Sequence, residues 1–576
     1  MTRPFAGLDL PVPLERLTLG RFVTDVATAS RDREALAFGG HHWTYAEVEQ
    51  GARAFAGGLL ALGLPKGAKV ALLLGSRPEF VSAAFGTGMV GGVVVPISTL
   101  ATVPEREYIL RHSDASVLVV QPELRGHRFV EDLLAAHPAI AEAGGGPFRL
   151  PELPHLRHVV VIGDRNASGA LTSWDAVVEE GRSAPDGLVD ASIGEVHPAD
   201  DAIIVYTSGT TAVPKAVVHM HRAPVVQFYR FQDQMRLEPT DRVWSSFPFF
   251  WTAGLAMALG GTLAAGACLV MQETFDAGEA LRLIEQERVT TVHAFDHASA
   301  QLADHPDRAL RDTSSVRKIR AGTPFQQAIG VDTSEWDMRA AYGLTETFTM
   351  VTSIPATRPH EERMATHGTP LPGMQIRILD PESGVALPEG GIGEIAVKGI
   401  TLMRGYYKSF PEEAFDPDGW FRTGDAGWIG PDGHLHWTGR LDNLVKTAGA
   451  NVSAVEVETE AMFLGGLAVA SVVGVPHPTL GQAVVLCAVP RPGAEVDGRA
   501  VAEQLRGRLA SYKIPRVVLL FEEAELQFTG SDKVRTERLR ELAVARMVEA
   551  GTDEEWVTWL RGRSPRPPEV RRVRRK

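Results

Sequence analysis

The chain has 576 residues, of which 44% are hydrophobic and 22% charged, as in ordinary globular proteins. This length exceeds that of one hydrophobic core, so we expect two or more domains. The net charge of -13 argues against nonspecific nucleic-acid binding. Only Cys268 and Cys487 are present, both in apolar runs, which excludes a disulfide framework and favours a reducing cytoplasm.

The two ends of the chain carry no membrane or secretion signal that we recognise. Residues 1–6 lack the charged-then-apolar layout of a signal peptide, and no apolar run reaches the roughly 18 residues of a membrane helix. Residues 561–576 contain eight Arg or Lys and one Glu, about +7, which leaves about -20 on the rest. This segment is interrupted by prolines, so we predict a disordered extension, with a binding arm as the alternative.

The N-terminal part alternates between predicted strands and predicted helices. Residues 69–74 and 92–97 have the apolar runs of buried parallel strands, and residues 78–90 and 277–288 are helix-like. This alternation favours α/β layers. Residues 86–91 match GxGxxG, but they end a helix and precede a strand, the reverse of the dinucleotide-binding order, so we expect no Rossmann cofactor site there.

Residues 206–215, YTSGTTAVPK, form a loop of hydroxyl and glycine residues after the strand-like run 202–205. Its backbone N–H and side-chain O–H groups, close approach at Gly209 and the charge of Lys215 suit a polyphosphate. The loop lacks the Gly-Lys-Ser/Thr tripeptide of the Walker motif. Alone, such a loop is more often a simple turn, so its interpretation as a phosphate-binding loop depends on motifs elsewhere in the chain.

The predicted secondary structure changes at two points in the C-terminal half. Glycine-rich, aromatic residues from about 368 to 440 indicate short strands and hairpins, with turns at 380–384 and 432–433. After about 441, helices near 453–463 and 498–510 alternate with strands near 468–474 and 483–489. We therefore predict an α/β fold with three parts: a large domain of α/β layers with a small β-rich subdomain, a small α+β domain, and the basic tail, at residues 1–441, 442–556 and 557–576.

Several glycine-bounded polar clusters follow in a fixed order: YGLTE at 342–346, GEIAVKG at 393–399, GWFRTGD at 419–425, GRLDNLVK at 439–446 and TGSDKV at 529–534. Together with the loop at 206–215, they resemble the motifs of the adenylate-forming superfamily, which comprises acyl- and aryl-CoA synthetases, adenylation domains and luciferases. The resemblance covers roughly residues 20–545. One motif would be weak evidence, but six in order are strong.

The resemblance implies activation of a carboxylate by ATP, with acyl-adenylate and pyrophosphate as products. Donors, a metal and a cation must then offset the repulsion between two anions. The implied catalytic residues are Lys533 as the adenylation lysine, Thr345 on the α-phosphate, Glu346 as the ligand of Mg²⁺, and Arg440 on ribose or phosphate. The implied ATP-binding residues are Thr207, Ser208, Gly209, Thr210, Thr211, Lys215, Gly322, Thr323, Tyr342 (on adenine), Gly343, Asp425 (on ribose) and Arg440.

The implied acyl pocket is lined by Phe250, Trp251, Ala321, Gly322 and Gly343. Residues 247–254 resemble a Pro-x-Phe-His-x-x-Gly pattern in which Trp251 replaces the usual His, and we interpret them as an apolar wall or gate, with plain core packing as the alternative. Residues 247–256 contain no carboxylate to pair with an α-amino group, which disfavours amino-acid adenylation.

Further positions are implied by the resemblance or left open. Asp442 occupies the hinge about which the small domain would swing between two half-reactions, and Gly449 lies on the thiol tunnel. Asp296 and His297 either hydrogen-bond the acid or tie down a loop. His219 and His221 form an HxH pair whose better interpretation is packing and hydrogen bonding, not zinc binding.

The departures from the family pattern are Ala212, Ala216, Gln527, Asp532 and Asn443. The alanines would stiffen the loop or weaken ATP binding, and Asp532 would hold Lys533 away from ATP or raise the pKa of Lys533.

The sequence thus predicts a cytoplasmic acid–thiol ligase that uses ATP, Mg²⁺ and CoA on a hydrophobic fatty, aromatic or alicyclic acid. The main alternative transfers the acyl group to the phosphopantetheine of a carrier protein, which carries the same thiol as CoA. Luciferase-like oxidation and a nucleotide-binding pseudoenzyme are more distant alternatives. We expect no nucleic-acid partner and no membrane span; a homodimer is compatible with the sequence, which does not fix the oligomeric state.

Overall fold

The computed structural model describes residues 10–144, 147–163, 170–207, 214–337, 341–441, 444–447, 450–506, 508–509, 513–526, 536–550, 556–557 and 560. The chain divides into two compact units. Unit 1 comprises Met1–Arg377, Ala396–Arg422 and Gly430–Leu435, and unit 2 comprises Ile378–Ile395, Thr423–Ile429 and His436–Lys576. The domain boundary expected between residues 441 and 442 stays a prediction, because Asp442 and Asn443 lie outside the described residues.

Unit 1 contains an eight-stranded mixed sheet. Its strands, in spatial order, are β19 (Gly405–Tyr406), β9 (Lys215–Met220), β8 (Asp201–Thr207), β4 (Val93–Pro96), β3 (Lys69–Leu73), β5 (Ala115–Val120), β6 (His158–Val161) and β7 (Leu171–Ser173). The strands from β8 to β7 run parallel, whereas β9 and β19 are added antiparallel. The strands predicted at 69–74, 92–97 and 202–205 are confirmed.

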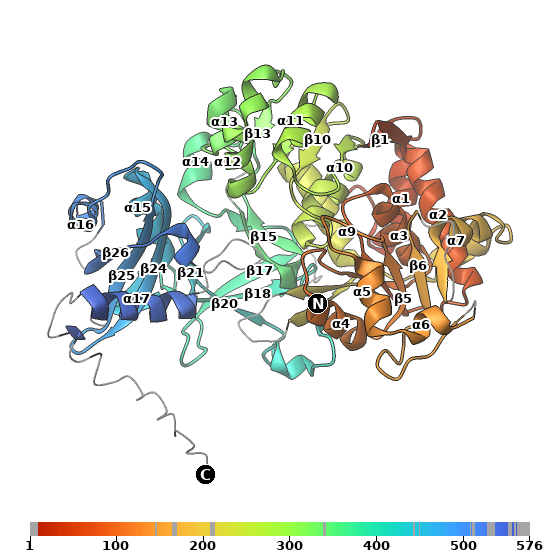
Figure 1. Cartoon of the computed structure of the whole chain (residues 1–576). Helices are drawn as coiled ribbons and strands as arrows, with labels where there is room; N and C mark the ends of the chain where they lie inside the picture. The colour runs from red at the N-terminus through yellow and green to blue at the C-terminus, as the bar shows by residue number, and fades with distance from the viewer. Residues whose placement is uncertain are drawn as a thin grey trace, which may run out of the picture. The chain divides into compact units, whose positions relative to one another are not determined.

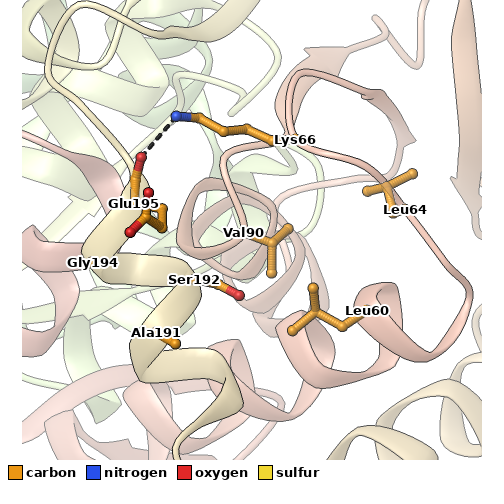
Figure 2. Close-up of a pocket in the computed structure, with 8 residues that line it drawn as sticks. All are labelled: Leu60, Leu64, Lys66, Val90, Ala191, Ser192, Gly194 and Glu195. Carbon is orange, nitrogen blue, oxygen red and sulfur yellow. Dashed lines mark hydrogen bonds between the residues drawn. The ribbon is translucent and has the colours of Figure 1, made fainter.

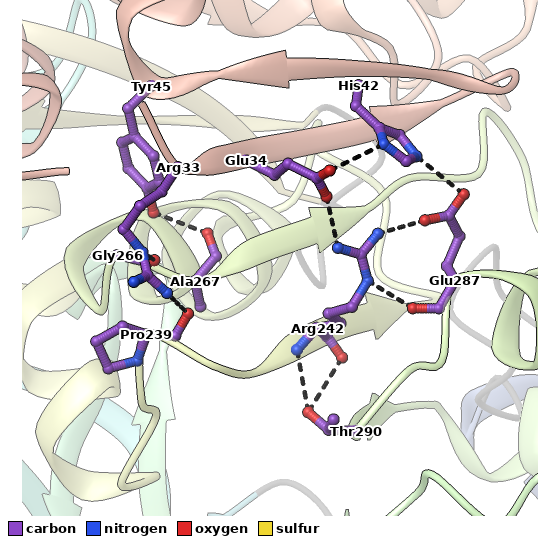
Figure 3. A network of polar contacts seen from close by, with 10 residues as sticks. All are labelled: Arg33, Glu34, His42, Tyr45, Pro239, Arg242, Gly266, Ala267, Glu287 and Thr290. Atoms are coloured by element: carbon purple, nitrogen blue, oxygen red, sulfur yellow. Dashed lines mark hydrogen bonds and ion pairs between the residues drawn. The ribbon is translucent and has the colours of Figure 1, made fainter. Parts of the chain in front are cut away.

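A second sheet of unit 1 has six strands: β13 (Lys318–Ile319), β12 (Thr291–His293), β10 (Arg242–Ser245), β11 (Cys268–Val270), β1 (Glu34–Phe38) and β2 (His41–Thr44). A ring of charged groups ties the β1–β2 hairpin to β10 (Figure 3). Arg242 donates to Glu34 at 2.7 Å and to Glu287, and the His42 ring lies between these carboxylates at 3.1 and 3.2 Å. Hydrogen bonding from Arg242 lowers the pKa of Glu34 despite partial burial.

Helices cover the sheets of unit 1. They are α1 (Leu19–Ala29), α2 (Tyr45–Ala61), α3 (Pro78–Met89), α4 (Val103–His112), α5 (Phe129–Ala136), α6 (Ala139–Glu142), α7 (Trp174–Arg182), α8 (Leu188–Glu195), α9 (Arg222–Gln234), α10 (Gly261–Ala264), α11 (Ala277–Gln286), α12 (Asp296–Asp304), α13 (Pro324–Ile329) and α14 (His360–Ala365). Short helical turns are η1 (Leu14–Arg16), η2 (Gly254–Gly260, a π-helix), η3 (Pro306–Leu310), η4 (Thr345–Thr347) and η5 (Pro411–Glu413). Figure 1 shows α4, α5 and α6 beside β5 and β6, where their apolar side chains share one buried cluster. Among the described residues, none of the helices combines the length and apolar character that a bilayer crossing requires.

The GxGxxG match at 86–91 serves helix packing. It ends α3 and precedes β4, as the sequence predicted. A Cβ on Gly86 would lie 2.5 Å from the carbonyl oxygen of Ala52 in α2, and one on Gly88 would lie 2.7 Å from Cβ of Leu19. These glycines therefore allow α3 to approach α1 and α2 closely.

Two smaller sheets follow, as expected for the glycine-rich segment. One consists of β14 (Ala341–Leu344), β15 (Thr349–Ser353) and β16 (Thr369–Pro370), all antiparallel. The other is ordered β17 (Met374–Leu379), β18 (Gly393–Gly399), β20 (Phe421–Ile429) and β21 (Leu435–Arg440). The turn at 380–384 is confirmed by the hydrogen bond from the Gly384 amide to the Asp380 carbonyl, 2.9 Å, and the turn at 432–433 by the one from the Gly433 amide to the Gly430 carbonyl, 2.9 Å.

Unit 2 contains a five-stranded sheet with a core on each face. Its strands are β23 (Ala450–Ser453), β22 (Leu444–Thr447), β25 (Gly481–Pro490), β24 (Leu467–His477) and β26 (Val517–Leu520), and its helices are α15 (Ala454–Phe463), α16 (Gly498–Leu505), η8 (Glu523–Glu525) and α17 (Thr536–Ala550). Alternate residues of β25 separate: Val485 and Cys487 pack with α17, and Val484 and Leu486 with α15 and α16. The predicted α/β fold with a small α+β part is thus confirmed, with mixed sheets. Cys268 and Cys487 are both buried and unbridged, and burial raises the pKa of each thiol to about 12.

Candidate active site

The predicted phosphate loop is carried by an antiparallel hairpin. β8 and β9 pair until Thr207 lies opposite Lys215, so both ends of the loop are fixed side by side. Thr207 is half-buried and Lys215 is exposed. Ser208, Gly209, Thr210 and Thr211, together with Ala212, lie outside the described residues.

The second predicted cluster forms a tight reversal. Tyr342 and Gly343 lie on β14, Thr345 and Glu346 on η4, and the chain returns along β15. Thr347 Oγ1 donates to the carbonyls of Leu344 at 3.1 Å and Thr349 at 2.7 Å, which closes the turn. Thr345 and Glu346 are half-buried at its tip.

Tyr406 brings these two clusters together. It lies on β19, which pairs with β9 so that Tyr406 is opposite Val217. Its hydroxyl donates to Glu346 Oε1 at 2.8 Å, and Lys215 Nζ lies 5.0 Å from the centre of its ring. The phosphate-loop cation and the predicted metal carboxylate therefore flank one tyrosine.

Sequence reasoning missed Tyr406. The available signal was a glycine followed by two tyrosines at 405–407, without an obvious partner. Its neighbour Tyr407 donates to Asp114 Oδ2 at 2.8 Å, so the two rings of this segment serve different contacts. Only the pairing of β19 with β9 reveals which of them reaches Glu346.

The HxH pair engages in packing and hydrogen bonding, as predicted. His219 Nε2 donates to the Thr345 carbonyl at 2.8 Å, and His221 Nδ1 accepts from the Leu19 amide at 3.2 Å. Both side chains are fully buried, and burial lowers the pKa of each ring to about 4. Within the described residues, no group of three or more His, Cys, Asp or Glu side chains could hold a metal.

Asp425 and Arg440 lie together in unit 2. Arg440 Nη1 lies 3.3 Å from Asp425 Oδ1 and donates to the Thr423 carbonyl at 3.1 Å. The Asp425 side chain is 9% exposed, whereas that of Arg440 is 45% exposed. The two side chains thus form an ion pair, and their roles on ribose and phosphate stay predictions.

Aromatic side chains gather where the acyl pocket was expected. We call Phe247, Phe250, Trp251 and Phe295 the aromatic cluster. Trp251 makes edge contacts with Phe250 at 5.4 Å and with Phe295 at 5.6 Å between ring centres, and Phe247 lies 4.3 Å from Phe295. Phe250 is buried, whereas the other three rings are half-buried. Phe295 was missed, because its contact with Trp251 bridges segments distant in sequence.

The segment around Ala321 is held by local hydrogen bonds. The Ala321 amide donates to Asp337 Oδ1 at 3.0 Å, the Gly322 amide to Gln326 Oε1 at 3.1 Å, and Thr323 Oγ1 to the Arg320 carbonyl at 2.9 Å. These contacts fix the backbone at the predicted pocket edge.

Asp296 and His297 make contacts compatible with a loop-tying role, and a hydrogen bond to the acid stays the alternative. The Asp296 carboxylate forms an ion pair with Arg320, and the His297 ring stacks on Phe295 at 5.9 Å. Both residues are exposed. Ala216, one of the departures, is 2% exposed in β9 and points into the core, so its methyl group belongs to the sheet and not to the loop.

Other predicted site residues cannot be placed. Lys533, Asp442 and Gly449 lie outside the described residues, as do the departures at Asn443, Gln527 and Asp532.

A separate pocket of 530 Å³ lies between α2, α3 and α8 (Figure 2). Its lining is largely aliphatic, and Lys66 at its edge donates to the Glu195 carbonyl at 2.7 Å and pairs with Asp200 at 2.7 Å. None of the predicted site residues lines this pocket, so it does not bear on the predicted chemistry.

Comparison with known proteins agrees with this geometry. Residues 23–407 match the family described as "AMP-binding enzyme", and residues 456–533 match "AMP-binding enzyme C-terminal domain". The chain is 31% identical to a feruloyl-CoA synthase of Amycolatopsis sp, over 90% of this chain and 97% of that protein. Among solved structures, it is similar to the anthranilate CoA ligase AuaEII in complex with anthranoyl-AMP (TM-score 0.76, 25% identity, 94% and 99% of the two chains). It is also similar to ATP-bound MatB from Rhodopseudomonas palustris (TM-score 0.72, 26% identity, 91% and 99%).

The match to the "AMP-binding enzyme" family covers more than half of the chain, and the feruloyl-CoA synthase, at 31% identity, is covered over 97% of its length. The motifs quoted from the sequence lie within the matched regions or between them, except that the last, 529–534, ends one residue beyond the second region. The chain therefore belongs to the AMP-binding enzyme family, that is, to the adenylate-forming superfamily, and is an enzyme of the acyl-CoA synthetase kind.

Proposed function

We propose that this enzyme joins a hydrophobic carboxylic acid to CoA in two steps. The acid carboxylate attacks the α-phosphorus of ATP, which forms acyl-AMP and releases pyrophosphate. The CoA thiol then attacks the acyl carbonyl, loses its proton, and forms acyl-CoA with AMP as the leaving group. The arrangement of Lys215 and Glu346 around Tyr406, beside the predicted phosphate loop, carries this proposal.

The residues of this arrangement have complementary tasks. Lys215 would offset charge on the β,γ-phosphates, and Thr345 would donate to the α-phosphate. The hard carboxylate of Glu346, next to the Thr345 hydroxyl, suits Mg²⁺, which would neutralise phosphate charge when bound. Tyr406 would fix one carboxylate oxygen of Glu346 and leave the group oriented toward ATP. Asp425 and Arg440 would receive the ribose.

The aromatic cluster supports a hydrophobic acid. Three half-buried rings and one buried ring offer apolar area, and the indole of Trp251 adds one N–H donor. The names of two relatives, a feruloyl-CoA synthase and an anthranilate CoA ligase, refer to aromatic acids and to CoA. These names favour CoA over a carrier-protein arm and an aryl acid among the hydrophobic candidates.

The second domain would supply the groups that the described residues leave out. Lys533 would bridge the acid carboxylate and the α-phosphate in the first step. Rotation about Asp442 would then remove Lys533 and open a thiol path past Gly449. This alternation remains part of the proposal.

Pyrophosphate release from ATP and Mg²⁺ over a panel of fatty, aryl and alicyclic acids tests the proposal. Release with at least one hydrophobic acid, followed by thioester formation with CoA, would support it. Absence of release with every acid would favour a nucleotide-binding pseudoenzyme, and thioester formation only with a carrier protein would favour the alternative acceptor.

Substitution of Lys533 tests the assignment of the adenylation lysine. Lys533→Ala should abolish most adenylation. Lys513→Ala is the matched control, because it removes the same charge from the same unit at a residue that pairs with Glu456, 2.6 Å, and has no predicted role in adenylation. Equal activity in the two variants would refute the role of Lys533.

A further inference from the structure

Two buried polar side chains donate hydrogen bonds to backbone carbonyls of the turn that carries Thr345 and Glu346. His219 of β9 donates to the Thr345 carbonyl at 2.8 Å. Gln227 of α9 donates through Nε2 to the carbonyls of Thr347 at 3.0 Å and Met350 at 2.8 Å. Both side chains are 0% exposed. Three carbonyls of one short turn therefore accept hydrogen bonds from other elements, and the Thr345 carbonyl also accepts one from the Phe348 amide within the turn, at 3.0 Å.

The backbone of this turn needs such support. Phe348 and Thr349 have φ values of 49° and 90°, in the left-handed region that non-glycine residues rarely adopt. Such a conformation persists only where surrounding contacts impose it. His219 supplies two of these contacts, since its ring also packs edge-on against Phe348 at 4.9 Å.

Burial of the polar ring of His219 carries a desolvation penalty, so its hydrogen bond is the feature that a residue at this position has to supply. Because its partner is a carbonyl, Nε2 must carry the proton, and the buried ring is neutral. Its Nδ1 is buried with no hydrogen-bond partner in the described part of the chain. A leucine of similar volume would avoid that desolvation penalty but could not donate to Thr345.

We propose that His219 is a positioning residue for adenylation: by holding the Thr345 carbonyl, it orients the Thr345 hydroxyl and the Glu346 carboxylate toward ATP and Mg²⁺. This inference rests on the proposed function. His219 touches neither substrate in this mechanism and acts only through the turn.

The chain offers a closely matched control in His221. It too is 0% exposed, makes one hydrogen bond, to the Leu19 amide at 3.2 Å, and has one buried ring nitrogen without a partner among the described residues. The two histidines differ in their hydrogen-bond partner: His219 binds the Thr345 carbonyl of the candidate site, and His221 binds the Leu19 amide. A general effect of a buried histidine on stability should therefore appear in both, whereas an effect on ATP should appear only at His219.

The test compares His219→Leu, His219→Gln and His221→Leu. MgATP binding is measured by calorimetry, KM and kcat by pyrophosphate release, and stability by thermal unfolding. We expect His219→Leu to weaken MgATP binding and raise its KM about 10-fold, the effect of one lost hydrogen bond. His219→Gln, whose amide nitrogen can replace Nε2, should stay within about threefold of the unmodified enzyme. His221→Leu should lower the unfolding temperature without changing MgATP binding.

Equal MgATP affinity in His219→Leu and His221→Leu would overturn the inference. If His219→Leu does not fold, the shorter amide of His219→Asn replaces it, and equal affinity in the Gln and Asn variants would overturn the inference. A failure of the proposed function is distinct, because the unmodified enzyme would then neither bind MgATP nor release pyrophosphate; that result would overturn both.

Discussion

Substitution of Gly343 by alanine is the sharpest test of the turn at the candidate site. A Cβ on Gly343 would lie 1.8 Å from the Thr349 carbonyl oxygen and 2.9 Å from Cα of Met350. Real Cβ atoms do not come within 3.0 Å of other heavy atoms, so the Thr349 carbonyl would have to retreat by at least about 1.2 Å. The obstacle is backbone, which cannot turn aside as a flexible side chain could.

The displacement has two consequences of predictable size. Overpacking of this kind costs about 1–3 kcal/mol of the free energy of unfolding. The Thr349 carbonyl also accepts from Thr347 Oγ1 at 2.7 Å, so its movement is transmitted to the segment that carries Thr345 and Glu346. Misplacement of reacting groups by about 1 Å reduces rates by about 100-fold, and we expect that loss in kcat/KM for MgATP.

The assay is pyrophosphate release together with thermal unfolding, and Gly194→Ala is the control. Gly194 lies in helix α8, where an added Cβ meets no atom within 4 Å. Alanine there should stabilise the helix by about 0.5–1 kcal/mol and leave activity unchanged. Equal rates and equal stabilities in Gly343→Ala and Gly194→Ala would refute the reasoning, because the contact between a Cβ at Gly343 and the Thr349 carbonyl would then have no effect.

Three further predictions address the metal carboxylate, the acyl pocket and acid stability. Tyr406→Phe removes a hydrogen bond to the charged Glu346 and should weaken MgATP binding about 10-fold by calorimetry; unchanged affinity would contradict its role. Phe295→Ala opens the aromatic cluster and should change the ratio of kcat/KM between aryl and short-chain acids at least about 10-fold, without changing KM for ATP; an unchanged ratio would exclude the ring from the pocket. Asp241→Asn should cost about 3 kcal/mol at pH 7, because it leaves two cations beside a buried uncharged group. Although burial raises it, the pKa of Asp241 is lowered in the folded state by hydrogen bonds from those cations, so its stabilisation is present above the unfolded pKa of about 3.9 and is lost as pH falls through the folded pKa. Urea unfolding should therefore show the difference between the two proteins shrinking below about pH 4, and a constant difference would refute this assignment.

The sequence predicts elements where local pattern and burial agree. Strands β3 and β4 are apolar runs apart from Lys69 at the start of β3, and α11 shows the helical period and a cap at Asp276, whose side chain accepts from the Glu279 amide. Sheet order is not predictable in this way. The antiparallel addition of the short β19 beside β9 depends on contacts between segments almost 200 residues apart in the sequence.

The same limit applies to the candidate site. Lys215 and Glu346 could be named from their motifs, because glycine and hydroxyl residues at fixed spacing surround them. Tyr406 and Phe295 could not, since each becomes recognisable only through a ring or hydroxyl contact with a distant segment. His219 was noticed for its spacing to His221, and the role that we propose for it rests on the hydrogen bond to Thr345, which the sequence does not reveal.

Strand β9 explains why fold and site depend on one register. Side chains alternate along a strand, so Ala216 and Val218 face the core while Lys215 and His219 share the opposite face. Tyr406 pairs opposite Val217 between them. A slip of one residue would turn Lys215 and His219 toward the buried cluster that now holds Ala216 and Val218, and away from Tyr406 and the Thr345 turn. The apolar pattern of β9 therefore selects the arrangement of cation, tyrosine and carboxylate at the same time as it fills the core, and the alanine at 216 contributes to that selection.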